Sequence, residues 1–288
     1  MLDVILQHAL GGIVLGAILA LPALGLALIW RIQGFPHLAH GSLMTIAAYC
    51  ALTLMNAHWP LAAALAAALL VTALAGVGMH VGVYRRLAGR PMLSLFIAAI
   101  GIDLFVRYGV IFIFGSDFQT FPIPAQRGLQ LGPVVARPLD LVLLAVAFVA
   151  LGGVWWMFRA TTVGRRMRAV ADNVALARLS AISPQRVLIS MWILASVLAG
   201  ISGILLGMRN VVSPTLGWDV LLLAFAAAIL GGISNPFGAA VGAFLMGLVS
   251  QIGIIWLPTA YEEGIAFALI ALVLLVRPRG LFGEAVRV

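Results

Sequence analysis

Two residues of opposite charge lie inside one apolar stretch of the sequence. Asp103 and Arg107 are four positions apart, so a helix would place both side chains on one face, where opposite charges can pair. Pairing is the expected role, because either charge alone would cost several kcal/mol in lipid. The alternative is that the pair gates a passage or contacts a zwitterionic ligand.

Two histidines accompany a break between apolar stretches. Gly34 and Pro36 lie next to His37 and His40, and both breakers oppose helix propagation. The imidazoles have two possible roles: they contact a ligand, or they hydrogen-bond backbone groups that the break sets free.

A second break, residues 231–238, reads GGISNPFG and contains Ser234 and Asn235. Broken helices at membrane depth are tolerated only where protein or a watery cavity receives the freed backbone groups. Two such interruptions therefore indicate a path for a solute. Ordinary tight turns at the membrane surface are the alternative.

The connection from residue 159 to residue 186 is basic and rich in helix-forming residues. Asp172 is placed to cap a short helix that begins near Asn173, and Val174, Leu176 and Leu179 form part of an apolar stripe. A folded amphipathic element of this kind can dock a soluble partner. The alternative is a basic helix that lies on anionic lipid headgroups.

Several enzymatic and metal-binding chemistries are not expected. The GISG run that begins at Gly200 matches the serine motif of rhomboid-type proteases, but all five histidines precede it, whereas those enzymes need a later histidine. A phosphate-binding GxxxxGK[ST] loop is impossible because the sequence has no lysine. Neither HExxH nor a metal-ligand cluster occurs, and Cys50 is the only cysteine. We expect neither an enzyme nor a metal site.

The elements that position these residues are apolar helices. Hydrophobic residues make up 64% of the chain and charged residues only 9%, a composition that suits lipid as the solvent. We expect an all-α membrane helix bundle of eight or nine segments with broken or re-entrant helices. It would form one transmembrane domain over residues 1–288, with a cytoplasmic loop at 159–186. The apolar segments are at about 8–30, 37–57, 60–83, 92–115, 139–158, 187–208, 220–233, 237–257 and 264–276.

The arginines predict the orientation. All seventeen basic residues are arginine, and the net charge is +8. With the C-terminus inside, thirteen arginines fall on the cytoplasmic face, three are external, and the N-terminus is outside. Because these residues are spread over separate loops of one face, nucleic-acid binding is not expected. The first basic residue is Arg31, so the opening apolar stretch is read as a retained helix and not a signal peptide.

Three blocks carry a resemblance to a known family. Residues 164–207 begin GRRMRAVADNVALARLSAISPQRV, residues 24–49 read LGLALIWRIQGFPHLAHGSLMTIAAY, and residues 226–247 read AAAILGGISNPFGAAVGAFLMG. Taken in their order along the chain, they resemble the branched-chain amino acid ABC permeases of the LivH type, over about a third of the chain. His37 departs from the pattern, since the family usually has asparagine there, and this departure bears on the identity of the solute.

The resemblance implies a multi-pass permease of the bacterial inner membrane that works by ATP-driven alternating access. Its partners would be a second permease of the LivM type, two cytoplasmic ATP-binding subunits that hold ATP and Mg, and a periplasmic solute-binding protein. This chain would bind no cofactor. The resemblance at His37, His40 and Ser42, together with the charged pair and the second break, gives a solute path of His37, His40, Ser42, Asp103, Arg107, Ser234 and Asn235. The contacts of the coupling loop with the ATPase would be Arg165, Arg166, Arg168, Asp172, Asn173, Leu176 and Leu179.

Two other transport classes remain as alternatives. An ion-coupled secondary transporter would need acidic residues deep in the membrane, and Asp103 is the one deep candidate. A passive channel would have no need of a folded basic loop. Asn210 and Trp218 flank an external loop and could meet a receptor or anchor the chain at the interface.

Overall fold

A computed structural model describes residues 1–124, 126–258 and 261–283. Each apolar segment expected from the sequence lies on a helix: α1 (Leu2–Gln33), α2 (His40–Asn56), α3 (Leu61–Met79), α4 (Met92–Phe114), α5 (Pro138–Ala160), α8 (Pro184–Arg209), α9 (Leu216–Gly231), α10 (Pro236–Gly253) and α11 (Glu262–Val276). The remaining elements are the π-helix η1 (His80–Tyr84), the short helices α6 (Thr162–Asp172) and α7 (Val174–Leu179), and an antiparallel hairpin of β1 (Leu129–Leu131) and β2 (Val134–Ala136).

Six helices are long and apolar enough to cross a membrane: α1, α3 together with η1, α4, α5, α8 and α10. The other three are shorter, with 17 residues in α2, 16 in α9 and 15 in α11. The all-α membrane bundle is therefore confirmed, apart from the small hairpin. Crossing by the three shorter helices remains a prediction.

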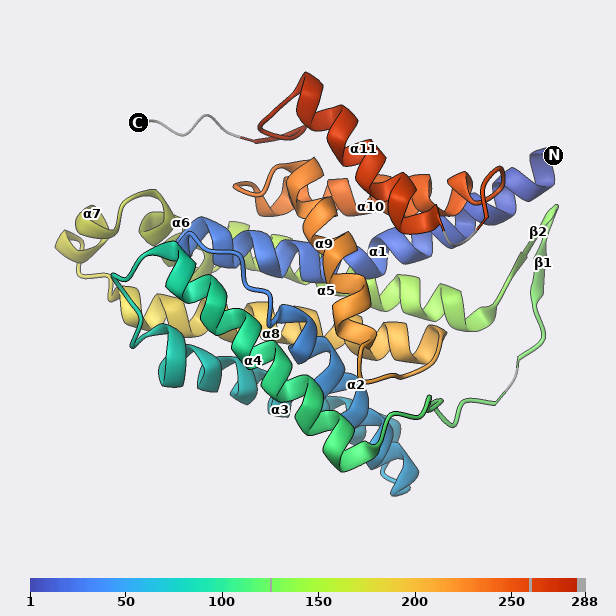
Figure 1. Ribbon diagram of the computed structural model, residues 1–288, viewed down its shortest axis with the longest axis horizontal. Helices are drawn as coiled ribbons and strands as arrows, with labels where there is room; N and C mark the ends of the chain where they lie inside the picture. The colour runs from blue at the N-terminus through green and yellow to red at the C-terminus, as the bar shows by residue number, and fades with distance from the viewer. Residues whose placement is uncertain (125, 259–260, 284–288) are drawn as a thin grey trace.

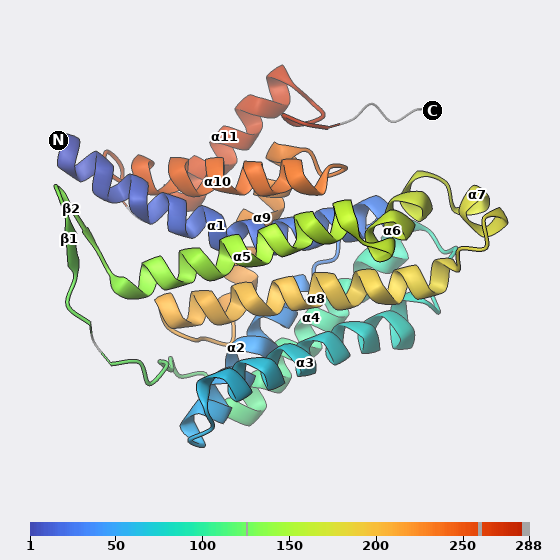
Figure 2. The same ribbon diagram turned by 180° about the vertical axis from the view of Figure 1, so that it is seen from behind.

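Helix α1 lies at the centre of the bundle. Every residue from Gly16 to Ile29 is buried, as expected for a helix that is apolar on all sides. Helices α5, α8, α9 and α10 surround it, and α9 crosses it steeply while the other three run alongside (Figures 1 and 2). With 32 residues at about 1.5 Å each, α1 exceeds the ~30 Å hydrocarbon thickness of a bilayer.

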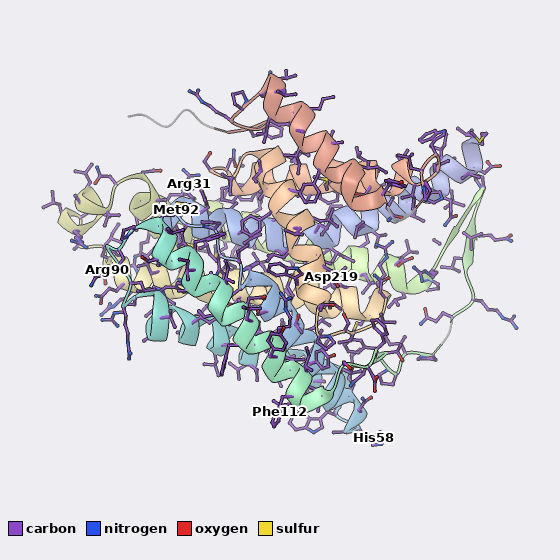
Figure 3. The ribbon with its side chains drawn as sticks, viewed as in Figure 1. Arg31, His58, Arg90, Met92, Phe112 and Asp219 are labelled. Carbon is purple, nitrogen blue, oxygen red and sulfur yellow. The ribbon has the colours of Figure 1, made fainter. Side chains whose placement is uncertain are left out.

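Glycines allow the backbones of α1 and α10 to approach each other. A Cβ atom on Gly16 would lie 2.7 Å from Phe244 Cα, and one on Gly247 would lie 2.4 Å from the Gly16 nitrogen. Helices in lipid associate through such close van der Waals contact, because lipid supplies no hydrophobic drive between them. The outer helices expose large apolar side chains instead, among them Phe112 of α4 (Figure 3).

The two helix breaks differ in kind. In the first, the exposed Gly34 ends α1 with a φ of 74°, and the side chains of Phe35, His37 and Ala39 are then buried. The second is a tight turn between α9 and α10, and the backbone of residues 281 and 282 donates to the carbonyls of residues 230 and 231 there. Loops normally run over a protein surface, but both breaks contain buried residues, and Gly231, Gly232 and Pro236 are those of the second.

Replacing Gly247 with leucine should push α1 and α10 apart, because the new side chain would meet the α1 backbone. Overpacking of this kind typically costs about 1–3 kcal/mol, so thermal unfolding of the purified protein in detergent should shift to lower temperature. Gly152→Leu is the matched control, since open space surrounds Gly152 on α5. Equal unfolding temperatures for the two variants would contradict this packing.

Candidate functional site

A buried polar cluster joins α2, α4 and α9. Arg107 donates to Asp103 on the same helix, which confirms the pairing expected from their spacing. Ser42 of α2 donates to the second carboxylate oxygen of Asp103 at 2.6 Å. The Arg107 guanidinium also lies 4.4 Å from the ring centre of Trp218 on α9. Asp103 is only 3% exposed, so these donors offset the cost of burying its charge.

The first turns of α2 and α9 meet beside this cluster. A Cβ atom on Gly41 would lie 2.5 Å from the Gly217 carbonyl oxygen, so the two backbones touch. The Gly217 amide donates to the Thr45 hydroxyl at 3.1 Å. Free amide groups at a helix start need such acceptors when they are buried. Two helices therefore begin inside the molecule, next to a charged pair.

His37 belongs to a second cluster, made of aromatic rings. Its Nδ1 lies 3.0 Å from the Tyr84 hydroxyl, and its ring stands edge-on to Trp192 at 4.8 Å between centroids. Trp192 in turn donates from Nε1 to the Gln33 side chain at 3.0 Å. Helix α1, the π-helix η1 and helix α8 are thereby tied to the break after α1 through side chains far apart in the sequence.

Sequence reasoning missed His80, Tyr84 and Trp192. Residues 80–84 form a π-helix, a widened turn that is often found at functional sites. Within it, His80 and Tyr84 are buried and both rings stack on Trp192, with centroids 5.5 and 5.2 Å away. The sequence offered one signal for these residues: a histidine and a tyrosine lie one helical turn apart at the end of the third apolar segment.

A cavity of about 500 Å³ adjoins the aromatic cluster. Gln33, His80, Tyr84, Arg85 and Gln185 are among its lining residues. Polar and aromatic groups in a concavity of this size suit a small solute. Deeper inside, neither ring nitrogen of His40 has a hydrogen-bond partner, and its Nε2 faces Gly25, where a Cβ would lie 2.9 Å away.

Ser234 and Asn235 are placed apart from these clusters. Asn235 Oδ1 accepts the amides of Phe237 and Gly238 and so caps α10, and its amide group donates to the Phe282 carbonyl at 3.4 Å. Ser234 lies beside it in the turn. The fold uses this pair to stabilise a turn, and among the residues that the structure describes the hydrogen bonds of Asn235 go to α10 and Phe282 and not to the charged pair or the aromatic cluster.

The basic connection folds into α6 and α7, which project from one end of the bundle (Figures 1 and 2). Thr161 caps α6 and Asn173 caps α7 with their side chains. The expectation that Asp172 would cap the second helix was therefore wrong, because its carboxylate lies 3.3 Å from Arg31 of α1. Asn173 adopts the extended backbone that a cap requires.

Apolar side chains of α7 face outward. Leu176 is 60% exposed and Leu179 is 85% exposed, while Ala177 faces the bundle. Arg165 and Arg166 are exposed on α6, whereas Arg168 folds back to donate to the Phe158 carbonyl. Exposed leucines on a short helix outside the bundle provide a surface that a protein partner can cover.

Many of the described arginines, unlike Arg137 and Arg209 near Asp140 at the other end, lie at the same end as α6 and α7. Arg31 and Arg90 lie there (Figure 3), and shared cavities place Arg85, Arg159 and Arg186 beside them. The N-terminus lies at the opposite end, where Gln7 pairs with Val135 of β2. Arg287 lies outside the described residues.

The charged pair allows a direct test of its role. Asp103→Ala should lower the free energy of unfolding by about 3–5 kcal/mol, because it leaves the partly buried guanidinium of Arg107 without its carboxylate partner. The double variant Asp103→Leu/Arg107→Met should recover most of this loss, as buried pairs replaced by apolar residues often do. Denaturation of the purified protein measures both. A double variant as unstable as the single one would contradict a structural pairing, and a stable double variant without uptake would assign the pair to transport.

A family model described as "Branched-chain amino acid transport system / permease component" matches residues 8–274. The chain is 29% identical to the high-affinity branched-chain amino acid transport system permease proteins BraD of Pseudomonas aeruginosa and LivH of Escherichia coli K12, over 97% of this chain and 96% of each relative. It is 27% identical to the ribose import permease protein RbsC of Escherichia coli K12, over 89% of this chain and 81% of that protein.

The fold also resembles a solved structure, PsaBC from Streptococcus pneumoniae in complex with Fab. The TM-score is 0.54 at 11% sequence identity, over 96% of this chain and 92% of the other. At this identity the likeness concerns the fold alone. The family match covers nearly the whole chain, so the resemblance of the three sequence blocks is confirmed, and this chain belongs to the branched-chain amino acid transport system permease family.

Proposed function

We propose that this chain is the permease subunit of an ABC importer that moves branched-chain amino acids or similar small solutes by ATP-driven alternating access. Membership of the permease family carries the proposal. Members of this family are membrane permease subunits and not enzymes, so ATP and Mg would be held by partner subunits. The whole chain would form one transmembrane domain, with the coupling loop at residues 159–186.

The proposed orientation has the N-terminus in the periplasm and the C-terminus in the cytoplasm. Arginine-rich flanks stay on the cytoplasmic side of a membrane, and the arginine-rich end carries α6, α7 and the turn after α9. The three expected external arginines, Arg127, Arg137 and Arg209, lie on or beside the hairpin end, where Arg209 and Asp140 are 3.6 Å apart.

Helix α7 is the proposed contact with an ATP-binding subunit. Its exposed leucines would enter a groove of that subunit, and Arg165 and Arg166 would flank it. The caps on α6 and α7 hold the loop in a fixed shape, and the Arg31–Asp172 pair ties it to α1. Because α1 is packed against most of the bundle, a movement of the loop can be transmitted through α1 to the interior of the bundle.

The proposed solute path passes the buried break between α1 and α2. Two observations support it: His40 and His80 bury ring nitrogens without hydrogen-bond partners, and a cavity lined by both polar and apolar residues opens beside Tyr84. Ser42, Asp103 and Arg107 would bound the path near the helix starts. Asn235 and Ser234 would act on it only through the shape of the turn.

The partners are a second permease subunit, two ATP-binding subunits and a periplasmic solute-binding protein. The relatives named as branched-chain amino acid permeases favour amino acids as solutes over sugars, because they cover more of the chain at higher identity than the ribose permease. An ion-coupled mechanism has less support, since Asp103, the deep acid that it would use, already accepts from Ser42 and Arg107.

Leu179→Asp should uncouple the transporter without unfolding it, because this side chain is 85% exposed. Stimulation of ATP hydrolysis by the solute-loaded binding protein should fall about tenfold or more, which corresponds to about 1.4 kcal/mol of lost contact. Leu179→Met is the matched control and should keep full stimulation. Unchanged stimulation in the aspartate variant would remove α7 from the coupling role.

His37→Asn should change which solutes are taken up, because His37 borders the proposed path and family members usually carry asparagine there. Tyr84→Phe is the matched control: it removes the same 3.0 Å hydrogen bond but leaves the imidazole in place. Competition of unlabelled solutes with radiolabelled leucine uptake measures the profile. Identical profiles in His37→Asn and the parent would exclude solute contact, and equal changes in both variants would indicate that the hydrogen bond positions the break.

A further inference from the structure

Three arginines surround an apolar cavity where α1 and α5 end. The cavity has a volume of about 250 Å³ and lies between α1, α5, α6 and the start of α10. Arg31 comes from the last turns of α1, Arg159 from the last turn of α5, and Arg168 from α6. Helices α1 and α5 both belong to the set that can cross a membrane, and we take their ends to lie at headgroup level.

The positive charge around this cavity exceeds the negative charge. Among the residues that the structure describes, Asp172 is the one acid with a contact to these arginines, 3.3 Å from Arg31. Arg168 donates to a backbone carbonyl, which is neutral. Arg159 lies over the Trp155 ring at 4.6 Å and keeps its donors for another acceptor. A phosphate group would balance the remaining charge.

The rest of the lining is apolar and aromatic. Leu28 and Ile32 of α1, Phe158 of α5 and Phe237 of α10 contribute to it, and Trp155 is 48% exposed on the outer face of α5. Tryptophan is enriched at membrane interfaces, where its ring is in contact with both headgroups and acyl chains. An occupant of this cavity would therefore have an anionic head and an apolar tail.

We propose that this cavity binds the headgroup of an anionic phospholipid from the surrounding bilayer. The phosphate contacts Arg31 and Arg159, and the first carbons of an acyl chain lie against Phe158 and Phe237. Basic pockets between membrane helices are a general form of lipid recognition. Because Arg31 also holds Asp172, the bound lipid shares a guanidinium with α6 and stabilises the position of the loop. This inference rests on the bilayer location of α1 and α5 and is independent of the solute.

Native mass spectrometry of the full chain in mild detergent tests the proposal. The parent protein should retain added phosphatidylglycerol in preference to phosphatidylcholine of the same acyl chains. Arg31→Gln/Arg159→Gln should lower this retention about tenfold or more. Arg86→Gln/Arg178→Gln is the control, because it removes two arginines from the same end outside this cavity. Arg159→Lys keeps the charge and should retain most of the lipid.

Three results would overturn the proposal: equal retention of phosphatidylglycerol by the double variant and the parent, equal retention of both lipids by the parent, or displacement of the lipid by millimolar inorganic phosphate. The last result would assign the cavity to a soluble phosphate instead. Arg159→Gln alone leaves the Arg31–Asp172 pair in place, so a partial loss in this variant separates lost lipid binding from misfolding.

Discussion

Close contact between backbones is the constraint on which the structure depends. Lipid gives helices no hydrophobic reason to associate, so they must touch through small residues. Helix α1 meets α10 at Gly16 and Gly247, and α8 meets α2 where a Cβ on Gly203 would lie 2.1 Å from the Met44 carbonyl oxygen. These contacts fix α1 at the centre and hold the buried break after it in one position. The polar side chains around that break are positioned by the same packing.

Two helices that begin inside the molecule supply the buried polar groups of the site. The starts of α2 and α9 touch at Gly41 and Gly217, and their buried amides need acceptors. Thr45 supplies one, and the Asp103–Arg107 pair lies nearby with Ser42 as a further donor. The aromatic cluster on the other side of the break adds rings and a cavity. A path along this break would thus offer polar groups to a solute while the outer helices stay apolar toward lipid.

The spacing of residues that are close together in the sequence predicted the parts of the structure that form between such neighbours. The apolar helices, the Asp103–Arg107 pair and the folded loop all follow from periodicity or from residues four apart. Partners distant in the sequence could not be predicted in this way. Asp172 caps nothing because Arg31, 141 positions away, binds it, and Ser42 reaches Asp103 across 61 positions. The π-turn places His80 and Tyr84 against Trp192, a partner so far along the chain that local spacing could not indicate the contact.

We propose that α7 faces the cytoplasm and contacts an ATP-binding subunit. Thiol chemistry on Leu176→Cys, in a chain that also carries Cys50→Ala, tests this placement most directly within the assembled transporter. A membrane-impermeant thiol reagent should label this position from the cytoplasmic side alone, and a bifunctional crosslinker should join it to the ATP-binding subunit. Labelling from the periplasmic side, or full labelling with no crosslink to that subunit, would contradict the account.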